Sequence, residues 1–171
     1  MTNKNRVIVI TGAGSGVGRD SARLFLDSGW KVALIGRRME TLEETAQNHI
    51  EAICVKCDVS DYKAVKDCFS TIINKFGRVD VLFNNAGLAK PSQTIDELDV
   101  DDWKEVVNIN LNGSFFCAKE AFKTMRNQKP QGGDQQPHCG VRGEPHQAPV
   151  QSAASCEPPQ WMRDHGVGAE Q

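Results

Sequence analysis

The sequence predicts an α/β fold, a doubly wound parallel sheet over residues 1–128, on three observations. Val7-Ile8-Val9-Ile10 is a continuous apolar run, which is typical of a parallel strand covered on both faces. A glycine-rich turn, Thr11 to Gly18, separates this strand from a helical pattern. In all, strand-like and helix-like segments alternate four times, as they do in right-handed βαβ units.

Apolar periodicity and capping residues predict the helices and strands that follow the glycine-rich turn. Further strands are expected at 31–35, 52–57 and 79–83, with a charged helix at 40–48. The first helix is expected to end at Gly29 and to bury a face made of Val17, Ser21, Leu24, Phe25 and Ser28. The predicted strand order is 3-2-1-4, which leaves the fourth strand at an edge.

Two longer helices complete the predicted domain. Ser60 is expected to cap a helix that runs to Phe76. The buried stripe of that helix is expected to be Tyr62, Val65, Phe69, Ile72, Ile73 and Phe76. Asp99 is expected to cap a long helix at 101–125, after which the sheet pattern stops. The prediction is therefore a partial domain, truncated after the fourth strand and the following helix.

Residues 129–171 have a different composition. They contain no Leu, Ile, Phe or Tyr, and six of the chain's seven prolines lie between Pro130 and Pro159. Such a segment has too few large apolar side chains to offset the entropy lost on ordering, and its prolines interrupt helix and strand ladders. We therefore expect a disordered Pro/Gly/Gln-rich tail.

Composition excludes several classes of partner and location. The formal net charge is −2 and the isoelectric point is about 6.1, which argues against nucleic acid and anionic membranes as partners. No apolar run approaches the ~18 residues of a membrane span, and the N-terminus lacks a signal-peptide core. The sequence therefore predicts a cytoplasmic protein.

The cysteines are expected to be free thiols. Cys54 and Cys57 have the spacing of a redox dithiol, but positions three apart on a strand point to opposite faces. No metal site is expected either. The tail contains histidines and cysteines, but their spacing matches no zinc-binding pattern and few apolar residues surround them in the sequence. These residues are His138, Cys139, His146, Cys156 and His165.

The glycine-rich turn predicts a phosphate-binding site. Glycine permits the tight bend and lets the backbone approach a pyrophosphate, which then meets the free N–H groups of the helix. The flanking strand and helix supply the context that this function requires. The expected cofactor-binding residues of this turn are Gly12, Ser15, Gly16, Val17 and Gly18.

Three motifs together resemble the short-chain dehydrogenase/reductase family, whose members are NAD(P)-dependent oxidoreductases with a Rossmann-type fold. They are Thr-Gly-x3-Gly-x-Gly at 11–18, Asn-Asn-Ala-Gly at 84–87, and Asn110 within Val107 to Gly113. The resemblance covers Arg6 to about Met125 and implies hydride transfer between an alcohol or carbonyl and a nicotinamide. It also implies that a helix such as 101–125 forms a subunit interface, so a homo- or hetero-oligomer is expected.

The same resemblance assigns individual cofactor contacts. It implies that Asn85, Ala86 and Gly87 border the adenosine ribose. It further implies that Asp58 contacts the adenine through its carboxylate and Val59 through its backbone. Asn110 would anchor a water of the proton relay, and it is the one member of the family's catalytic tetrad that this sequence retains.

The end of the second predicted strand indicates the choice of cofactor. An NAD site places an acidic residue there to accept hydrogen bonds from the ribose 2′-hydroxyl, whereas this chain has Gly36 followed by Arg37 and Arg38. Two guanidinium groups suit a 2′-phosphate. We therefore expect NADP in preference to NAD. The alternative is that one of these arginines caps the next helix or points to solvent.

The catalytic residues of the family have no counterparts after the long helix. The Ser and the Tyr-x3-Lys pair should follow it, yet Tyr62 is the only tyrosine. Tyr62 and Lys66 have the right spacing, but they precede the Asn-Asn-Ala-Gly motif and Tyr62 lies on an apolar stripe. The prediction is therefore a chain that binds a dinucleotide and does not turn over. The alternatives are a non-enzymatic partner of an intact relative and a non-functional product.

Overall fold

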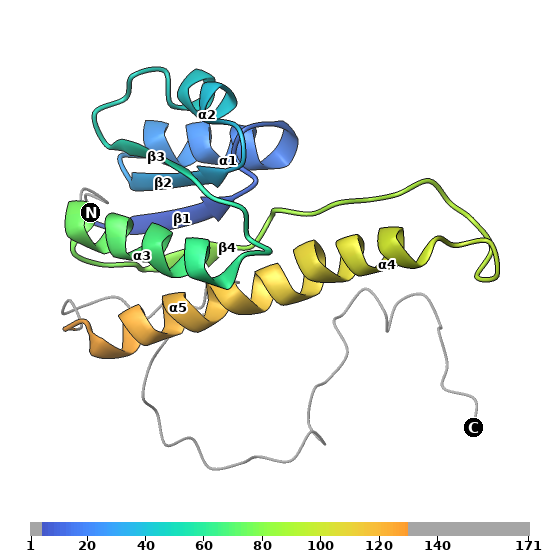
Figure 1. The fold of residues 1–171 in the computed structure, drawn as a ribbon. Helices are drawn as coiled ribbons and strands as arrows, with labels where there is room; N and C mark the ends of the chain where they lie inside the picture. Colours follow the sequence, from blue (N-terminus) through green and yellow to red (C-terminus); the bar gives the residue numbers. More distant parts are fainter. Residues whose placement is uncertain (1–4, 130–171) are drawn as a thin grey trace, which may run out of the picture.

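The computed structural model describes residues 5–129 and confirms the predicted sheet. The strands are β1 (Val7–Thr11), β2 (Lys31–Gly36), β3 (Ala52–Lys56) and β4 (Val81–Phe83), parallel and in the order β3-β2-β1-β4. The helices are α1 (Gly16–Asp27), α2 (Met39–Ala46), α3 (Tyr62–Phe76), α4 (Val100–Val107), the π-helical η1 (Asn108–Gly113) and α5 (Ser114–Asn127) (Figure 1). The predicted tail at 129–171 lies, after its first residue, outside the described residues.

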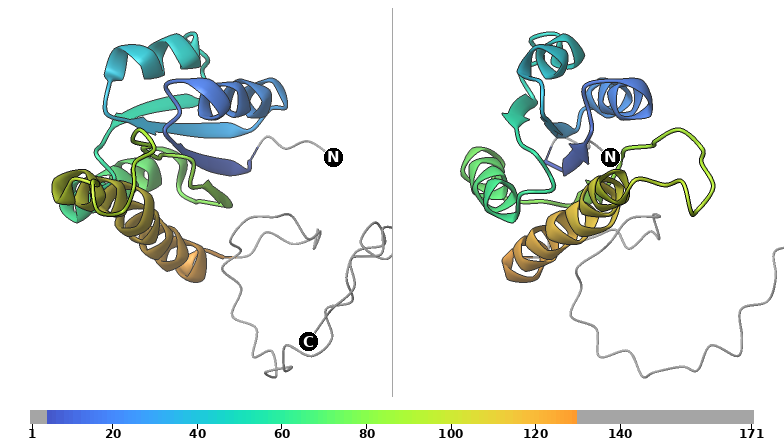
Figure 2. Two further views of the ribbon diagram at one scale, coloured as in Figure 1. Left: turned by 90° about the vertical axis from the view of Figure 1, so that its right-hand side faces the viewer. Right: turned by 45° about the vertical axis from the view of Figure 1, so that its right-hand side comes forward.

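Helices cover both faces of the sheet (Figure 2). Alternate residues of β1 point to opposite sides, so Ile8 and Ile10 join one apolar cluster while Val9 joins the other. The first cluster is closed by Leu26 of α1 and Leu42 of α2. Burial on both faces explains why β1 and β2 are almost continuously apolar in sequence.

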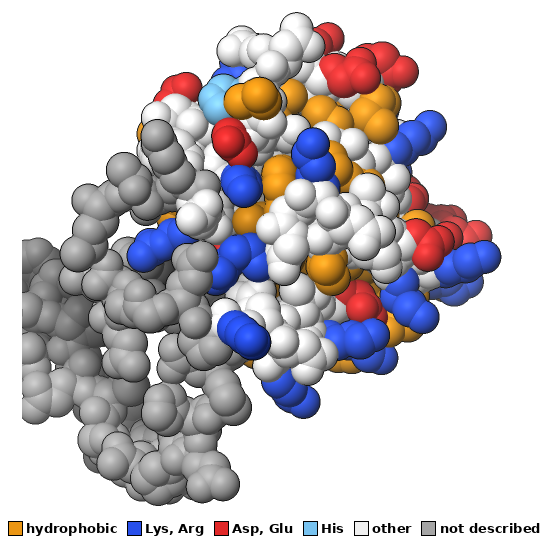
Figure 3. All heavy atoms as spheres, turned by 90° about the vertical axis from the view of Figure 1, so that its left-hand side faces the viewer, with side chains coloured by type: hydrophobic (Ala, Val, Ile, Leu, Met, Phe, Trp, Pro, Cys, Tyr) orange, Lys and Arg blue, Asp and Glu red, His pale blue; other side chains and the backbone are white. Residues whose placement is uncertain are grey.

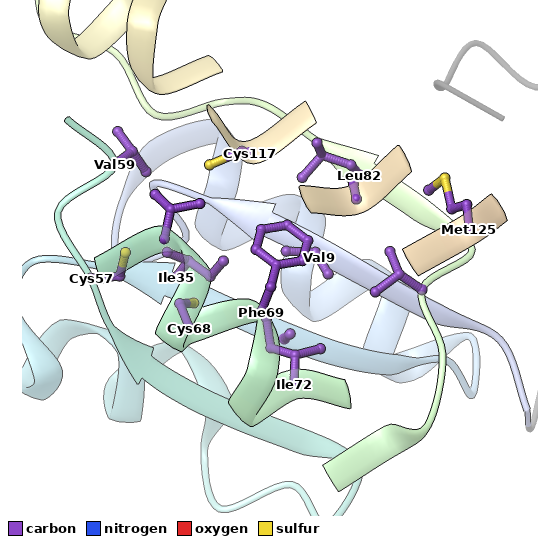
Figure 4. Close-up of a cluster of buried hydrophobic side chains, with 14 of the residues drawn as sticks. Val9, Ile35, Cys57, Val59, Cys68, Phe69, Ile72, Leu82, Cys117 and Met125 are labelled. Carbon is purple, nitrogen blue, oxygen red and sulfur yellow. The ribbon is translucent and has the colours of Figure 1, made fainter. Parts of the chain in front are cut away.

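The second cluster lies between the sheet, α3 and α5. Phe69, which is 2% exposed, points from α3 toward Val9 on β1 (Figure 4). Cys117, Ala121 and Met125 of α5 complete this cluster. Residues 114–127 are therefore part of the core of the domain.

The predicted buried face of the first helix is wrong. Val17 and Leu24 are each 66% exposed, and α1 instead buries Gly18, Ala22 and Leu26. Small residues let this helix lie close to β1, and hydrophobicity alone does not identify that face.

The N-cap of α3 is Asp61 and not Ser60. Its carboxylate accepts from the backbone N–H groups of Lys63 at 2.8 Å and Ala64 at 3.2 Å. Ser60 lies one residue earlier and bonds to Asp58. Ile73 of the predicted stripe is partly exposed, while Cys68 is buried in its place.

The predicted long helix is present as α4, η1 and α5 in succession, with Asp99 as its N-cap. The structure differs from the prediction in its middle turn, where η1 carries π-type hydrogen bonding. Such segments are rare and occur frequently at functional sites. No helix within residues 5–129 is long and apolar enough to cross a membrane.

Side-chain amides fix this long helix to the two segments that flank β4, one before the strand and one after it. Asn84 Nδ2 donates to the carbonyl of Ser114 at 3.0 Å. Gln128 donates to the carbonyl of Val79 at 2.8 Å and accepts from its N–H at 3.0 Å. These contacts set the position of the helix along the strand.

The end of the sheet where the strands begin shows Lys and Arg side chains among small hydrophobic areas (Figure 3). Two arginines near the starts of β1 and β4 take part in the fold. The guanidinium of Arg6 lies 5.6 Å from the Trp30 ring centroid, and Arg78 pairs with Asp80, which accepts from the N–H of Val7 at 2.8 Å. The functional cavity lies at the opposite end.

Two turn glycines have different structural roles. A Cβ on Gly18 would lie 2.4 Å from the Gly12 carbonyl oxygen and 2.5 Å from Asn85 Nδ2. Gly16 has a positive φ of 50°, but a Cβ there would meet nothing within 4 Å. Gly18 therefore permits close packing, while Gly16 permits a left-handed backbone.

We predict that Gly18→Ala lowers the free energy of unfolding by about 2–3 kcal/mol because it overpacks the turn. Gly16→Ala is the matched control and should cost only about 1 kcal/mol, the strain of its backbone conformation. Urea denaturation of both variants measures the difference. Equal losses would contradict the packing role of Gly18.

Tyr62 ties α3 to α5 through a partly buried polar contact. Its hydroxyl donates to the Glu120 carboxylate at 2.8 Å, and its ring lies 5.1 Å from that of Phe116. Glu120 is only 7% exposed, so water cannot readily replace the Tyr62 hydroxyl as the hydrogen-bond donor to its carboxylate.

We predict that Tyr62→Phe lowers the free energy of unfolding by about 1–3 kcal/mol, because a buried carboxylate loses its donor. Thr71→Ala on the exposed face of the same helix serves as control and should change it by less than about 0.5 kcal/mol. Denaturant titration followed by circular dichroism gives both values. A stability for Tyr62→Phe equal to that of the unsubstituted chain would count against this role.

Candidate functional site

The carboxyl ends of the strands converge on one cavity of about 340 Å³. This volume lies in the range of small-molecule and cofactor sites. Its walls come from the glycine-rich turn, the ends of β2 and β3, the segment after β4, and η1. The lining residues are Gly12, Gly14, Ser15, Val17, Gly36, Arg37, Arg38, Thr41, Cys57, Asp58, Val59, Asn85, Ala86, Gly87 and Ile109.

Helix α1 begins at this cavity, and within residues 5–129 the backbone N–H groups of its first three residues have no hydrogen-bond partner. Ser15 is the N-cap residue, and its side chain makes no capping hydrogen bond. The first turn of α1 holds no acidic residue. The unpaired N–H groups and the positive end of the helix dipole therefore suit an anion such as a phosphate.

The segment after β4 is bonded to the end of β1. The buried hydroxyl of Thr11 accepts from the N–H groups of Asn85 at 3.0 Å and Ala86 at 2.9 Å. Asn85 Nδ2 donates to the carbonyl of Thr11 at 3.0 Å. These bonds hold residues 85–87 against the glycine-rich turn.

Arg37 and Arg38 lie at the end of β2 and are exposed. Among residues 5–129, neither guanidinium has a carboxylate within ion-pair distance. Arg38 is the N-cap residue of α2, but its side chain makes no capping bond. Both arginines are therefore available to an anionic group at this edge of the cavity.

Asp58 and Val59 form the edge of the cavity next to β3. One carboxylate oxygen of Asp58 accepts from Ser60 Oγ at 2.7 Å and from the N–H of Ser60 at 3.0 Å. Val59 is 7% exposed and packs against Gly113 of η1, where a Cβ would lie 2.8 Å from Val59 Cγ2. Glycine at 113 thus lets the long helix approach Val59 closely.

Asn110 does not line the cavity itself. It lies on η1, beside Gly87, and its side-chain amide forms two bonds with the backbone of Leu88. Oδ1 accepts from the Leu88 N–H at 2.8 Å, and Nδ2 donates to the Leu88 carbonyl at 2.9 Å. Its side chain therefore fixes the loop after Gly87 next to the cavity.

The described cysteines, Cys54, Cys57, Cys68 and Cys117, are free thiols. Cys54 packs against the α1–α2 cluster and Cys57 lies in the α3–α5 cluster, as the strand geometry predicts. Burial raises the pKa of Cys117 to about 12, so it is a neutral thiol at physiological pH. Residues 5–129 bring together no group of three side chains able to hold a metal ion.

Sequence reasoning found most of the lining residues and missed five. Gly14, Gly36, Thr41, Cys57 and Ile109 also line the cavity, whereas Gly16 and Gly18 do not. The positions of Gly14 and Gly36, inside the turn and at the strand end, could have indicated them. Thr41 and Ile109 come from helices, and no local pattern marks them.

The residues that line the cavity provide three kinds of chemistry. Helix N–H groups suit a pyrophosphate, the arginines suit a further phosphate, and Asp58 supplies a hydrogen-bond acceptor. Residues 85–87 form the wall between β1 and β4. A dinucleotide carries the partners that these residues suit. The cavity also lies where the strand order reverses, between β1 and β4, which is where open α/β sheets bind ligands.

Comparisons with known proteins agree with this geometry. Residues 6–134 match the family model described as short chain dehydrogenase. A 3beta-hydroxysteroid dehydrogenase of Mediterraneibacter gnavus is 40% identical over 132 residues, which cover 75% of this chain and 47% of that protein. A meso-2,3-butanediol dehydrogenase of Serratia marcescens is 36% identical over 127 residues, covering 73% and 50%.

A solved structure also superimposes on the described domain. It is the 3-ketoacyl-(acyl-carrier-protein) reductase from Brucella melitensis complexed with NADH, with a TM-score of 0.70 and 29% identity over 72% of this chain and 51% of that one. The chain thus spans about half the length of the relatives it matches. On the family model, the sequence relatives and the shared fold together, the chain belongs to the short-chain dehydrogenase family.

Proposed function

We propose that this chain binds a nicotinamide dinucleotide in the cavity at the carboxyl ends of β1–β4. The observation that carries the proposal is the meeting of the free N-terminus of α1, the Asp58 carboxylate and the 85–87 wall in one cavity. The proposed contacts are Gly12, Ser15, Gly16, Val17, Gly18, Arg37, Arg38, Asp58, Val59, Asn85, Ala86 and Gly87. Gly16 and Gly18 act through the backbone shape of the turn.

The proposed cofactor is NADP in preference to NAD. Gly36 ends β2, so no carboxylate stands where an NAD site would hold the ribose 2′-hydroxyl. Arg37 and Arg38 line that part of the cavity without carboxylate partners among residues 5–129. The NADH in the Brucella reductase belongs to that protein.

We further propose that residues 1–171 bind the dinucleotide without transferring hydride. The family's chemistry uses a tyrosine as acid and base, and the hydroxyl of Tyr62 is bonded to Glu120 between α3 and α5, away from the cavity lining. General acid–base catalysis requires the group within hydrogen-bond reach of the substrate. Asn110 remains beside the cavity, where it would support a proton-relay water.

A second candidate is a binding partner that docks through the long helix. Leu111, Phe115 and Phe122 are 64%, 60% and 38% exposed. They recur at intervals of four and seven residues, so they share one face of the helix. The proposed occupant of this face is a second copy or an intact relative. The expected cytoplasmic location is part of both proposals.

We predict saturable NADPH binding by the purified chain, tighter than NADH binding, in a fluorescence titration. Arg37→Ala should weaken NADPH about tenfold and leave NADH nearly unchanged, because a charge-assisted phosphate contact contributes about 1.5–3 kcal/mol. Arg126→Ala at the end of α5 is the control and should change neither. Equal binding of both dinucleotides would contradict the NADP preference, and no binding would contradict the proposed function.

We predict no oxidation of NADPH above the protein-free rate with a panel of carbonyl substrates, because the cavity lining within residues 5–129 includes no tyrosine to act as the acid. Loss of reduced-nicotinamide absorbance measures it. A rate above background would contradict this prediction. If Tyr62→Phe then abolished that rate, Tyr62 would be the acid.

A further inference from the structure

Asp58 is held in place by its neighbour Ser60. Both donors of Ser60, the hydroxyl at 2.7 Å and the backbone N–H at 3.0 Å, point to the same carboxylate oxygen, Oδ1. Two hydrogen bonds to one oxygen fix the plane of a carboxylate that would otherwise rotate. Within residues 5–129, the other oxygen, Oδ2, accepts no hydrogen bond, and Asp58 lines the cavity.

Within residues 5–129, the Ser60 side chain contributes no hydrogen bond to the fold apart from the one to Asp58. The capping of α3, which the sequence would give to Ser60, is done by Asp61. The Ser60 hydroxyl therefore acts on the Asp58 carboxylate and not on the helix.

We propose that Ser60 is a positioning residue for base selection: it holds Asp58 so that Oδ2 accepts a hydrogen bond from the exocyclic amino group of adenine. This inference rests on the proposed dinucleotide function. An ionised carboxylate is acceptor-only, so it pairs with an amino group. Hypoxanthine carries a carbonyl oxygen at that position, and two acceptors facing each other lose the bond and leave both groups unpaired.

A purely structural role of Ser60 predicts something different. If the Asp58–Ser60 contact only shaped the turn before α3, its loss would weaken every dinucleotide by the same factor. If Ser60 aims the carboxylate, its loss reduces the preference for adenine over hypoxanthine. The ratio of the two dissociation constants therefore separates the two roles.

The test is a titration of the full chain with NADPH and with its hypoxanthine analogue, reduced nicotinamide hypoxanthine dinucleotide phosphate. We expect the unsubstituted chain to prefer NADPH by about tenfold or more. In Ser60→Ala we expect this ratio to fall to about threefold or less, since only the backbone N–H still holds Oδ1. Ser60→Thr keeps a hydroxyl and should restore the ratio.

Ser70→Ala provides the matched control. Its hydroxyl bonds to the Lys66 carbonyl at 2.9 Å on the exposed side of α3, so its loss should leave the ratio unchanged. An unchanged ratio in Ser60→Ala, or no discrimination by the unsubstituted chain, would overturn this inference alone. Failure of the unsubstituted chain to bind NADPH would overturn the proposed function and this inference with it.

Discussion

The site depends on one junction, the contact between Thr11 at the end of β1 and Asn85 after β4. The Thr11 hydroxyl is 1% exposed and accepts two backbone N–H groups, while Asn85 returns a bond to the Thr11 carbonyl. These bonds join segments 74 positions apart in sequence at the point where a cavity opens. A buried hydroxyl replaces the strand-to-strand bonds that β4 can no longer make beyond Phe83. Without it, among residues 5–129, only the bonds from the Asn85 side-chain amide to the Thr11 and Gly12 carbonyls would hold the glycine-rich turn against the 85–87 segment.

The long helix extends this control to the rest of the cavity. The Asn84 side chain donates to the Ser114 carbonyl. The Asn110 side chain pairs with the backbone N–H and carbonyl of Leu88, and the Gln128 side chain pairs with those of Val79. Amide side chains suit this task because each carries both a donor and an acceptor and can pair with the N–H and the carbonyl of one residue. Gly113 then allows close contact with Val59. The position of the cavity wall at Val59 is thus set from a helix more than fifty residues away in sequence.

The strands and the glycine-rich turn followed from local signals in the sequence, namely apolar runs and glycine spacing. The strand order followed from the fold class, and Asp58, Val59 and residues 85–87 followed from the resemblance to the short-chain family. The buried face of α1 did not, because Gly18 and Ala22 pack by being small and carry no hydrophobic pattern. Ser60 and Asp61 are both good caps, and only the position of Asp58 decides which residue serves α3. Thr41 and Ile109 reach the cavity through tertiary packing, which no window of sequence reveals.

Binding and catalysis are physically separable in this fold. The groups proposed to hold the dinucleotide come from the strand ends and from the first turn of α1, all within residues 12–87 and all supported by the two apolar clusters. Proton transfer requires a hydroxyl and a cation placed against the substrate, and the one tyrosine of this chain is instead bonded within the α3–α5 contact. A cavity can therefore retain affinity for a cofactor while lacking the groups that would use it. If the proposed function holds, specificity for the base and the 2′-phosphate would rest on three charged residues: Asp58, Arg37 and Arg38.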